Sequence, residues 1–329
     1  MYKRQKYRGL HHYFRQNFAQ VTNPPIDSLR ETAVMSLKTR LGNLGNVLDE
    51  DSSQCDLLQL ESPVLSTAEY RAVRDIMGEA ACEVDCTFAV DEAADAGTDG
   101  GVALRAAIDR IRREAEEGVR AGATHVVLTD EHQGQSRAPI PMILATAAVH
   151  THLVRSSLRT FTSLNVRAAE CVDVHSFAVL IGVGATTVNA YLAQESIADR
   201  HRRGLFSPEL SLRDAVARYR KAIDKGLLKT MSKMGISVIS SYRGGTNFEA
   251  IGLSRALVAE FFPGMQSRIS GIGLSGISRR VLALHAVAWG SDVITLPVGG
   301  IYKKRVSGEA HAFDGGLMHT LQTLSLIHI

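Results

Sequence analysis

Apolar residues recur at helical spacing in several long segments of the chain, and short apolar runs separate these segments. The clearest predicted helix spans residues 102–121, where one face is apolar and the other is charged. Its apolar stripe consists of Leu104, Ile108, Ile111, Ala115 and Val119. Gly122 predicts the end of this helix, because glycine readily adopts the left-handed conformation found there. The apolar run at 125–128 is typical of a strand buried in a parallel sheet.

Strands and helices alternate through most of the remaining chain. The pattern predicts further strands at 83–90, 164–168 and 236–240, and further helices at 142–158, 174–184, 212–234 and 277–289. This alternation indicates an α/β fold with a mainly parallel sheet. A doubly wound sheet and a barrel-like arrangement both satisfy the pattern, which by itself leaves the two open.

Composition indicates a globular protein and excludes several other classes. The 329 residues are 45% hydrophobic and 22% charged, which suits one large α/β domain or two medium ones. A net charge of +3, with scattered basic residues, gives no indication of nucleic-acid binding. The chain lacks an apolar run of about 18 residues and a signal peptide, so we expect no membrane span and a cytoplasmic location. The four cysteines fit a reducing compartment, and Cys82 and Cys86 lack the second pair of a zinc site.

Two segments resemble parts of enzyme active sites. Residues 129–132, Thr-Asp-Glu-His, follow a predicted strand, and α/β folds place acid–base groups at that end of a strand, although loops there are polar in any case. Residues 271–276 have the glycine spacing of a dinucleotide-binding loop. The segment before them, 266–270, is short and polar, so we expect a glycine-rich bend before a helix and no well-formed strand.

Two further groups of residues suggest either a binding site or a structural role. His150, His152 and His175 lie near Asp173, but His150 and His152 are two apart on a predicted helix and point to different faces. We therefore expect ordinary hydrogen bonds there and no metal. Residues 240–253 contain a glycine loop in which Arg243 and backbone amides could hold an anion, or which only turns a strand into a helix. The turn is the favoured interpretation.

Residues 13–27 combine an amphipathic aromatic run with a polar turn. Pro24 and Pro25 fix the backbone, so Thr22 and Asn23 are expected to be extended with their polar groups in defined directions. A simpler interpretation is helix capping at 27–28, before a helix that starts at Leu29.

This stretch closely resembles a signature in the central domain of the glutamate synthase large chain. Further resemblance lies at 138–142, 180–182, 233–237 and 240–253, and residues 296–305 and 308–311 resemble the entry into the flavin domain of that family. The resemblance implies a barrel-like central domain, related to a TIM barrel and without a cofactor of its own. It therefore favours the barrel-like alternative.

The resemblance also implies a function. The family makes two L-glutamate from L-glutamine, 2-oxoglutarate and two electrons, using an amidotransferase domain and a domain with FMN and an iron–sulfur cluster. A small electron-donor subunit or ferredoxin supplies the electrons. This segment is expected to carry no catalytic, cofactor or metal residues, to link the two active sites, and to help wall an ammonia tunnel through Thr22 and Asn23.

The ends of the chain resemble a sequencing adapter read as protein. Residues 1–5 can be encoded by GTG TAT AAG AGA CAG, with GTG as a start codon, and residues 324–329 by CTG TCT CTT ATA CAC ATC. The two DNA sequences are reverse complements over their shared length. We expect adapter sequence at 1–5 and 324–329, a central domain at 6–290 and the start of an FMN-binding domain at 291–323. The alternatives are a free-standing, non-catalytic α/β module and a small flavin enzyme that uses Arg243 and the 271–276 loop for phosphate.

Overall fold

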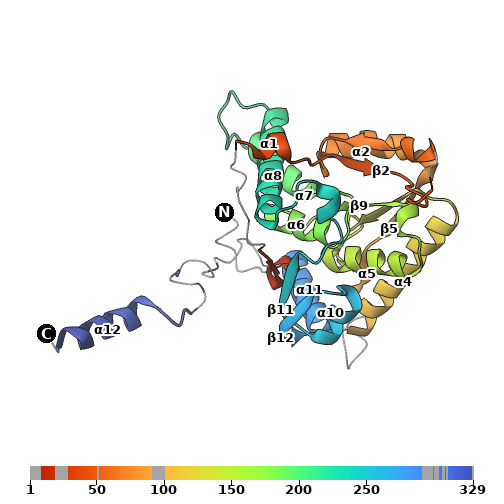
Figure 1. Cartoon of the computed structure of the whole chain (residues 1–329). Coiled ribbons are helices and arrows are strands. Elements are labelled where there is room, and N and C mark those ends of the chain that lie inside the picture. The colour runs from red at the N-terminus through yellow and green to blue at the C-terminus, as the bar shows by residue number, and fades with distance from the viewer. Residues whose placement is uncertain are drawn as a thin grey trace. The chain divides into compact units, whose positions relative to one another are not determined.

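The computed structural model describes residues 9–18, 29–49, 52–90, 101–290, 299, 304–305, 308 and 310–327 (Figure 1). The chain divides into two units, one of residues 10–285 and one that joins residues 1–9 to 286–329. In the second unit, α12 (Gly315–Ile327) has no buried residue. The candidate functional residues that the structure describes all belong to the first unit.

A five-stranded sheet forms the centre of the first unit, and all its neighbouring strands are parallel. In spatial order the strands are β4 (Val64–Leu65), β10 (Thr187–Asn189), β9 (Ser163–Arg167), β7 (His125–Thr129) and β5 (Ala81–Asp85). The predicted α/β fold with a mainly parallel sheet is confirmed. Within the described part of the chain this sheet is open, and the strands do not close into a barrel.

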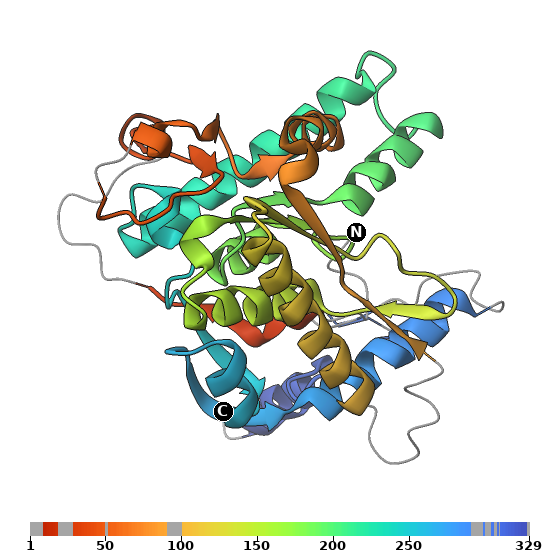
Figure 2. The same cartoon turned by 90° about the vertical axis from the view of Figure 1, so that its right-hand side faces the viewer.

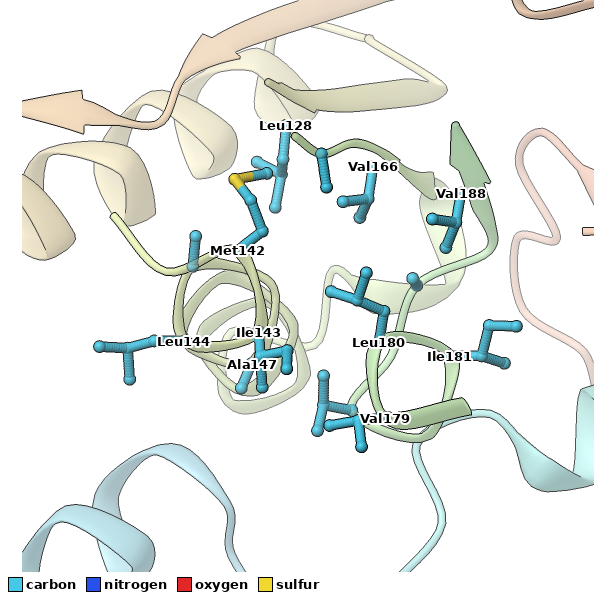
Figure 3. Close-up of a cluster of buried hydrophobic side chains, with 14 of the residues drawn as sticks. Leu128, Met142, Ile143, Leu144, Ala147, Val166, Val179, Leu180, Ile181 and Val188 are labelled. Atoms are coloured by element: carbon cyan, nitrogen blue, oxygen red, sulfur yellow. The ribbon is translucent and has the colours of Figure 1, made fainter. Parts of the chain in front are cut away.

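Three helices cover one face of this sheet: α4 (Gly101–Arg120), α5 (Met142–Arg155) and α6 (Val174–Gly182). Leu128, Val166 and Val188 point from the strands toward Met142 and Leu180 on the helices (Figure 3). Every residue of the predicted apolar stripe of α4 is buried, which confirms the helix and its inward face. Burial of such side chains supplies about 25 cal/mol per Å² of apolar area, the main favourable contribution to folding.

The opposite face of the sheet is covered by α2 (Thr67–Met77) and by the hairpin of β2 (Thr39–Leu41) and β3 (Leu58–Leu60) (Figure 1). Val127, between Val126 and Leu128, points to this side because successive side chains of a strand alternate. Helix α2 starts with a capping box, in which Ser66 and Glu69 each accept a hydrogen bond from the other's backbone N–H.

A small second sheet lies on the outer side of α5 with helices α10 (Arg255–Phe261) and α11 (Leu274–Trp289) (Figures 1 and 2). Its central strand β11 (Phe248–Leu253) pairs antiparallel with β1 (Phe14–Gln16) and parallel with β12 (Gln266–Ile272). Residues 266–270 therefore belong to a strand, and the prediction that this segment forms no well-formed strand was wrong. The strand is polar because it lies at the sheet edge, where most of its side chains are exposed.

Several of the remaining elements differ from those that the hydrophobic pattern predicted. The predicted helix at 212–234 is confirmed as α8 (Leu212–Met234), but 236–240 forms no strand, because Gly235 turns the chain and α9 (Ile239–Tyr242) buries Ile239. The pattern did not predict β10 or α7 (Tyr191–Arg202). Residues 83–90 form two strands, β5 and β6 (Thr87–Ala89), because the chain leaves the main sheet at Cys86 and pairs with β8 (Arg137–Pro139).

Candidate functional site

The two residues expected to line a tunnel, Thr22 and Asn23, lie outside the described residues, but the chain just before them is well defined. The backbone N–H of Asn17 donates to the carbonyl oxygen of Asn247 at 2.8 Å. The Gln16 amide nitrogen donates to the same oxygen at 3.0 Å, and the Tyr242 hydroxyl donates to Gln16 Oε1 at 2.7 Å. These bonds fix the segment that leads into the turn.

Aromatic packing holds the same segment from the core side. The ring of Phe14 lies 5.0 Å from Phe262 and 6.3 Å from Phe248, with near-perpendicular planes, and Tyr242 meets Phe248 in the same way. All four side chains are buried. Edge-to-face aromatic pairs contribute about 0.5–1.5 kcal/mol beyond their buried area, so β1 is firmly attached to β11.

The chain after the turn is attached to the same region. Ser36 N–H donates to Ser237 O at 2.8 Å, and Ile239 N–H donates to Ser36 O at 3.0 Å. Both flanks of residues 19–28 are thus held by residues 237–247. The predicted helix at Leu29 is shorter than expected: α1 spans Glu31–Val34 and begins without a side-chain cap. The proposed capping residues, 27 and 28, lie outside the described part.

The segment 129–132 lies at the C-terminal end of β7, as the sequence predicted. The Asp130 carboxylate is 1% exposed and accepts from the Ala169 N–H at 2.9 and 3.1 Å. Burial raises the pKa of Asp130 to about 6, although the bond from Ala169 acts in the opposite direction. Tyr191 also contacts this carboxyl group, and its hydroxyl accepts from Gln133 Nε2 at 3.0 Å.

Arg167, at the end of the neighbouring strand β9, completes this cluster. Its Nη2 donates to Glu131 Oε1 at 2.7 Å, and its guanidinium lies 4.8 Å from the Tyr70 ring and 5.0 Å from the Tyr191 ring. Sequence reasoning missed Arg167 and Tyr191, although Arg167 shares with 129–132 the signal of ending a strand. Asp130 and Glu131 both have partners, so these residues form a polar network that joins the ends of β7 and β9 to α2 and α7.

The glycines of the 271–276 loop serve close packing. A Cβ atom on Gly271 would lie 2.0 Å from the carbonyl oxygen of Gly252, and one on Gly276 would lie 2.8 Å from Ile272 Cβ. Arg243 bonds to Thr39 of β2, whereas Gly271 lies against β11, so the two parts of the supposed phosphate site contact different elements. This arrangement favours a structural role for the loop.

Replacing Gly271 with alanine should lower the free energy of unfolding by about 1–3 kcal/mol. The new methyl group would clash with backbone atoms of Gly252, which cannot move aside as a flexible side chain can. Gly273→Ala is the matched control, since its Cβ would lie 3.6 Å from Ser254 Oγ, an ordinary contact. Urea unfolding of both variants measures the difference. Equal effects of the two substitutions would contradict a packing role for Gly271.

The three histidines considered as metal ligands have separate partners. His150 Nδ1 accepts from Arg159, His152 Nε2 lies 2.5 Å from Glu116 Oε2, and His175 Nε2 donates to His11 O at 2.9 Å. Among the described residues, no group of three or more His, Cys, Asp or Glu residues is placed to hold a metal ion.

A cavity of about 390 Å³ opens at the other end of the parallel sheet, where β7 begins. Its lining includes Leu41, Asn43, Asp56 and His125. The cavity is therefore separate from the polar cluster around Asp130, which lies at the C-terminal strand ends. Among the described helices, none is long and apolar enough to cross a membrane.

Comparison with known proteins identifies the family. The family model of the glutamate synthase central domain matches residues 3–254, which include the whole parallel sheet and residues 13–27. This chain belongs to the glutamate synthase central domain family. The resemblance found in the sequence is thereby confirmed.

Relatives of this central domain are large glutamate synthase chains. The chain is 70% identical over 317 residues to the NADPH glutamate synthase large chain of Azospirillum brasilense, covering 96% of this chain and 20% of that one. It is 37% identical to the large chain of Bacillus subtilis, with 95% and 20% covered, and 38% identical to ferredoxin-dependent glutamate synthase 2 of Synechocystis, with 93% and 20% covered. The chain thus spans about a fifth of the length of these relatives.

Proposed function

We propose that this chain is the central part of a glutamate synthase, an enzyme that makes two L-glutamate from L-glutamine, 2-oxoglutarate and two electrons. The observation that carries the proposal is 70% identity over 96% of the chain to a glutamate synthase large chain. Because the chain spans a fifth of that relative, the amidotransferase site and the FMN and iron–sulfur sites belong to other parts of the polypeptide. In this division the segment itself carries no catalytic residue.

The segment's own task in this proposal is to connect the two active sites and to wall the passage for ammonia. Thr22 and Asn23 contribute to the wall. The contacts of Gln16, Asn17 and Ser36 with residues 237–247 support this role, because they attach the chain on both sides of residues 19–28 to one segment. A fixed wall of this kind keeps a reactive intermediate away from bulk water.

The partners follow from the same assignment. The amidotransferase and FMN domains of the same polypeptide flank the central domain, and the boundary between the central and FMN-binding domains lies near residue 290. Electrons come from a small electron-donor subunit or from ferredoxin, and the higher identity to the NADPH-named relative favours the subunit. The enzyme acts in the cytoplasm.

Thr22→Val in the full-length enzyme should weaken the coupling between glutamine hydrolysis and glutamate formation while the fold stays intact. Valine has nearly the shape of threonine but lacks its hydroxyl group, so the substitution changes the polarity of the wall and not its shape. The measurement compares glutamine consumed with glutamate formed from 2-oxoglutarate. Thr160→Val serves as the control, because Thr160 is exposed in the first unit. An unchanged ratio of the two half-reactions would count against a wall role for Thr22.

Two observations separate this proposal from its alternatives. A free-standing α/β module predicts a gene without a cysteine codon directly after the initiator and without downstream cluster cysteines. If the chain were a small flavin enzyme, the purified protein would be yellow, and a colourless preparation would contradict that alternative. The flanking genomic sequence is the most informative single test.

A further inference from the structure

Arg159 and Arg243 come close together at the end of the sheet where β10 begins. Arg159 Nη2 donates to Gly184 O at 2.9 Å and to Thr186 Oγ1 at 3.4 Å. Arg243 Nη2 donates to Thr39 Oγ1, and this hydroxyl donates to Thr186 O at 3.5 Å. The two guanidinium groups are therefore linked through Thr186, which Arg159 contacts, and Thr39, which Arg243 contacts.

Among the described residues, every acceptor of a hydrogen bond from Arg159 or Arg243 is neutral. Besides Gly184 and Thr186, Arg159 donates to His150 Nδ1 at 3.0 Å and to Thr162 O at 2.7 Å. Neither Arg159 nor Arg243 takes part in an ion pair with any residue that the structure describes. In addition, the Nε–H of Arg243 is buried and has no hydrogen-bond partner among the described residues.

Within the described part of the chain, no acidic side chain compensates this positive charge, and the pKa values of the three side chains reflect this. Burial lowers the pKa of Arg243 to about 10, and burial together with the charge of Arg243 lowers the pKa of Arg159 to about 10. Burial and the two arginines lower the pKa of His150 to about 3, so its ring is neutral and accepts from Arg159. The backbone of Gly244 lies against the same ring, since a Cβ there would be 3.1 Å from His150 Nε2.

A half-buried charge without a counter-charge and a buried, unpaired donor are both costly, and natural proteins satisfy nearly all such groups. We propose that Arg243, supported by Arg159, binds an oxyanion of the carboxylate or phosphate type. The Nε–H and the second hydrogen of Nη2 form the side of the guanidinium that takes two oxygens of such a group. The anion is either a small free ion or a carboxylate side chain from another part of the longer polypeptide.

The test uses the full-length polypeptide that contains this segment, and its measurement is thermal stability, which does not depend on glutamate synthesis. The Tm is recorded while sodium sulfate or sodium acetate replaces sodium chloride at constant ionic strength. Arg243→Gln removes the charge and the pair of guanidinium donors, whereas Arg243→Lys keeps the charge but lacks that pair of donors. Arg202→Gln is the control, because the Arg202 side chain is 77% exposed.

A free anion predicts a saturable rise of several degrees in the Tm of the wild type, reduced in Arg243→Lys, abolished in Arg243→Gln and retained in Arg202→Gln. An internal carboxylate predicts no rise, a lower Tm for Arg243→Gln in every salt, and a carboxylate within hydrogen-bond distance of Arg243 Nε in a structure of the full-length protein. The proposal is overturned if sulfate and acetate raise the Tm of wild type and Arg243→Gln equally. It is also overturned if no salt effect occurs and that structure shows no carboxylate at Arg243.

Discussion

Phe248→Ala should lower the free energy of unfolding by about 3–5 kcal/mol, the range found for truncation of a fully buried phenylalanine. The Phe248 side chain is 0% exposed and meets the rings of Phe14, Tyr242 and His175 at centroid distances of 6.1–6.3 Å. It also fills the space beside Gly182, where a Cβ would lie 2.6 Å from its ring. Its removal leaves a cavity between the small sheet and α6, which equilibrium unfolding in urea detects.

Phe18→Ala is the matched control, because Phe18 belongs to the same aromatic run but is 71% exposed. Its loss should change the free energy of unfolding by no more than about 0.5 kcal/mol. Hydrogen exchange adds a local measurement: the amide of Asn17, bonded to Asn247, should lose protection in Phe248→Ala. Similar losses of stability in both variants would mean that Phe248 does not anchor β1.

Asp130→Asn should gain stability relative to the wild type by about 3 kcal/mol as the pH rises from 4 to 7. Burial raises the pKa of Asp130 in the folded protein from its ordinary 3.8 to about 6. Below pH 3.8 the carboxyl group is protonated in both states and costs nothing. Between these values the unfolded chain releases its proton first, so the wild type loses stability, at about 1.4 kcal/mol per pH unit.

The measurement is the difference between the unfolding free energies of variant and wild type at a series of pH values. Taking the difference removes the contributions of all other titrating groups. The variant keeps one oxygen to accept from Ala169 N–H, so its fold should persist. A constant difference across this pH range would show that the Asp130 carboxyl group does not titrate there.

The sequence predicted best those elements whose own pattern decides their structure. The stripe from Leu104 to Val119 could be satisfied only by a helix with one buried face, and α4 has that face. The two proline residues at 24 and 25 also predict a fixed turn, which stays a prediction because these residues lie outside the described part. For α4, local periodicity gives the same answer as the fold.

Prediction failed where contacts distant in sequence decide the structure. Ile236, Val238 and Ile239 have the β-branched side chains of a strand, yet only Val238 forms a single bridge, because the chain turns at Gly235 and buries Ile239 in a helix. Strand β10 has three residues and gains its strand character from its neighbours β4 and β9. Strands this short carry too little pattern to be distinguished from a loop.

By itself, the sequence determined the α/β class, the parallel sheet, the inward face of α4 and membership of the glutamate synthase central domain family, because these depend on periodicity and on continuous motifs. Only the tertiary structure decided that Asp130 meets Tyr191, that Arg167 pairs with Glu131, and that Arg159 and Arg243 lie together with no described acid beside them. These residues come from separate elements, and their burial and spacing depend on how those elements pack. Hydrogen-bond partners and pKa shifts arise from that packing, which sequence spacing does not encode.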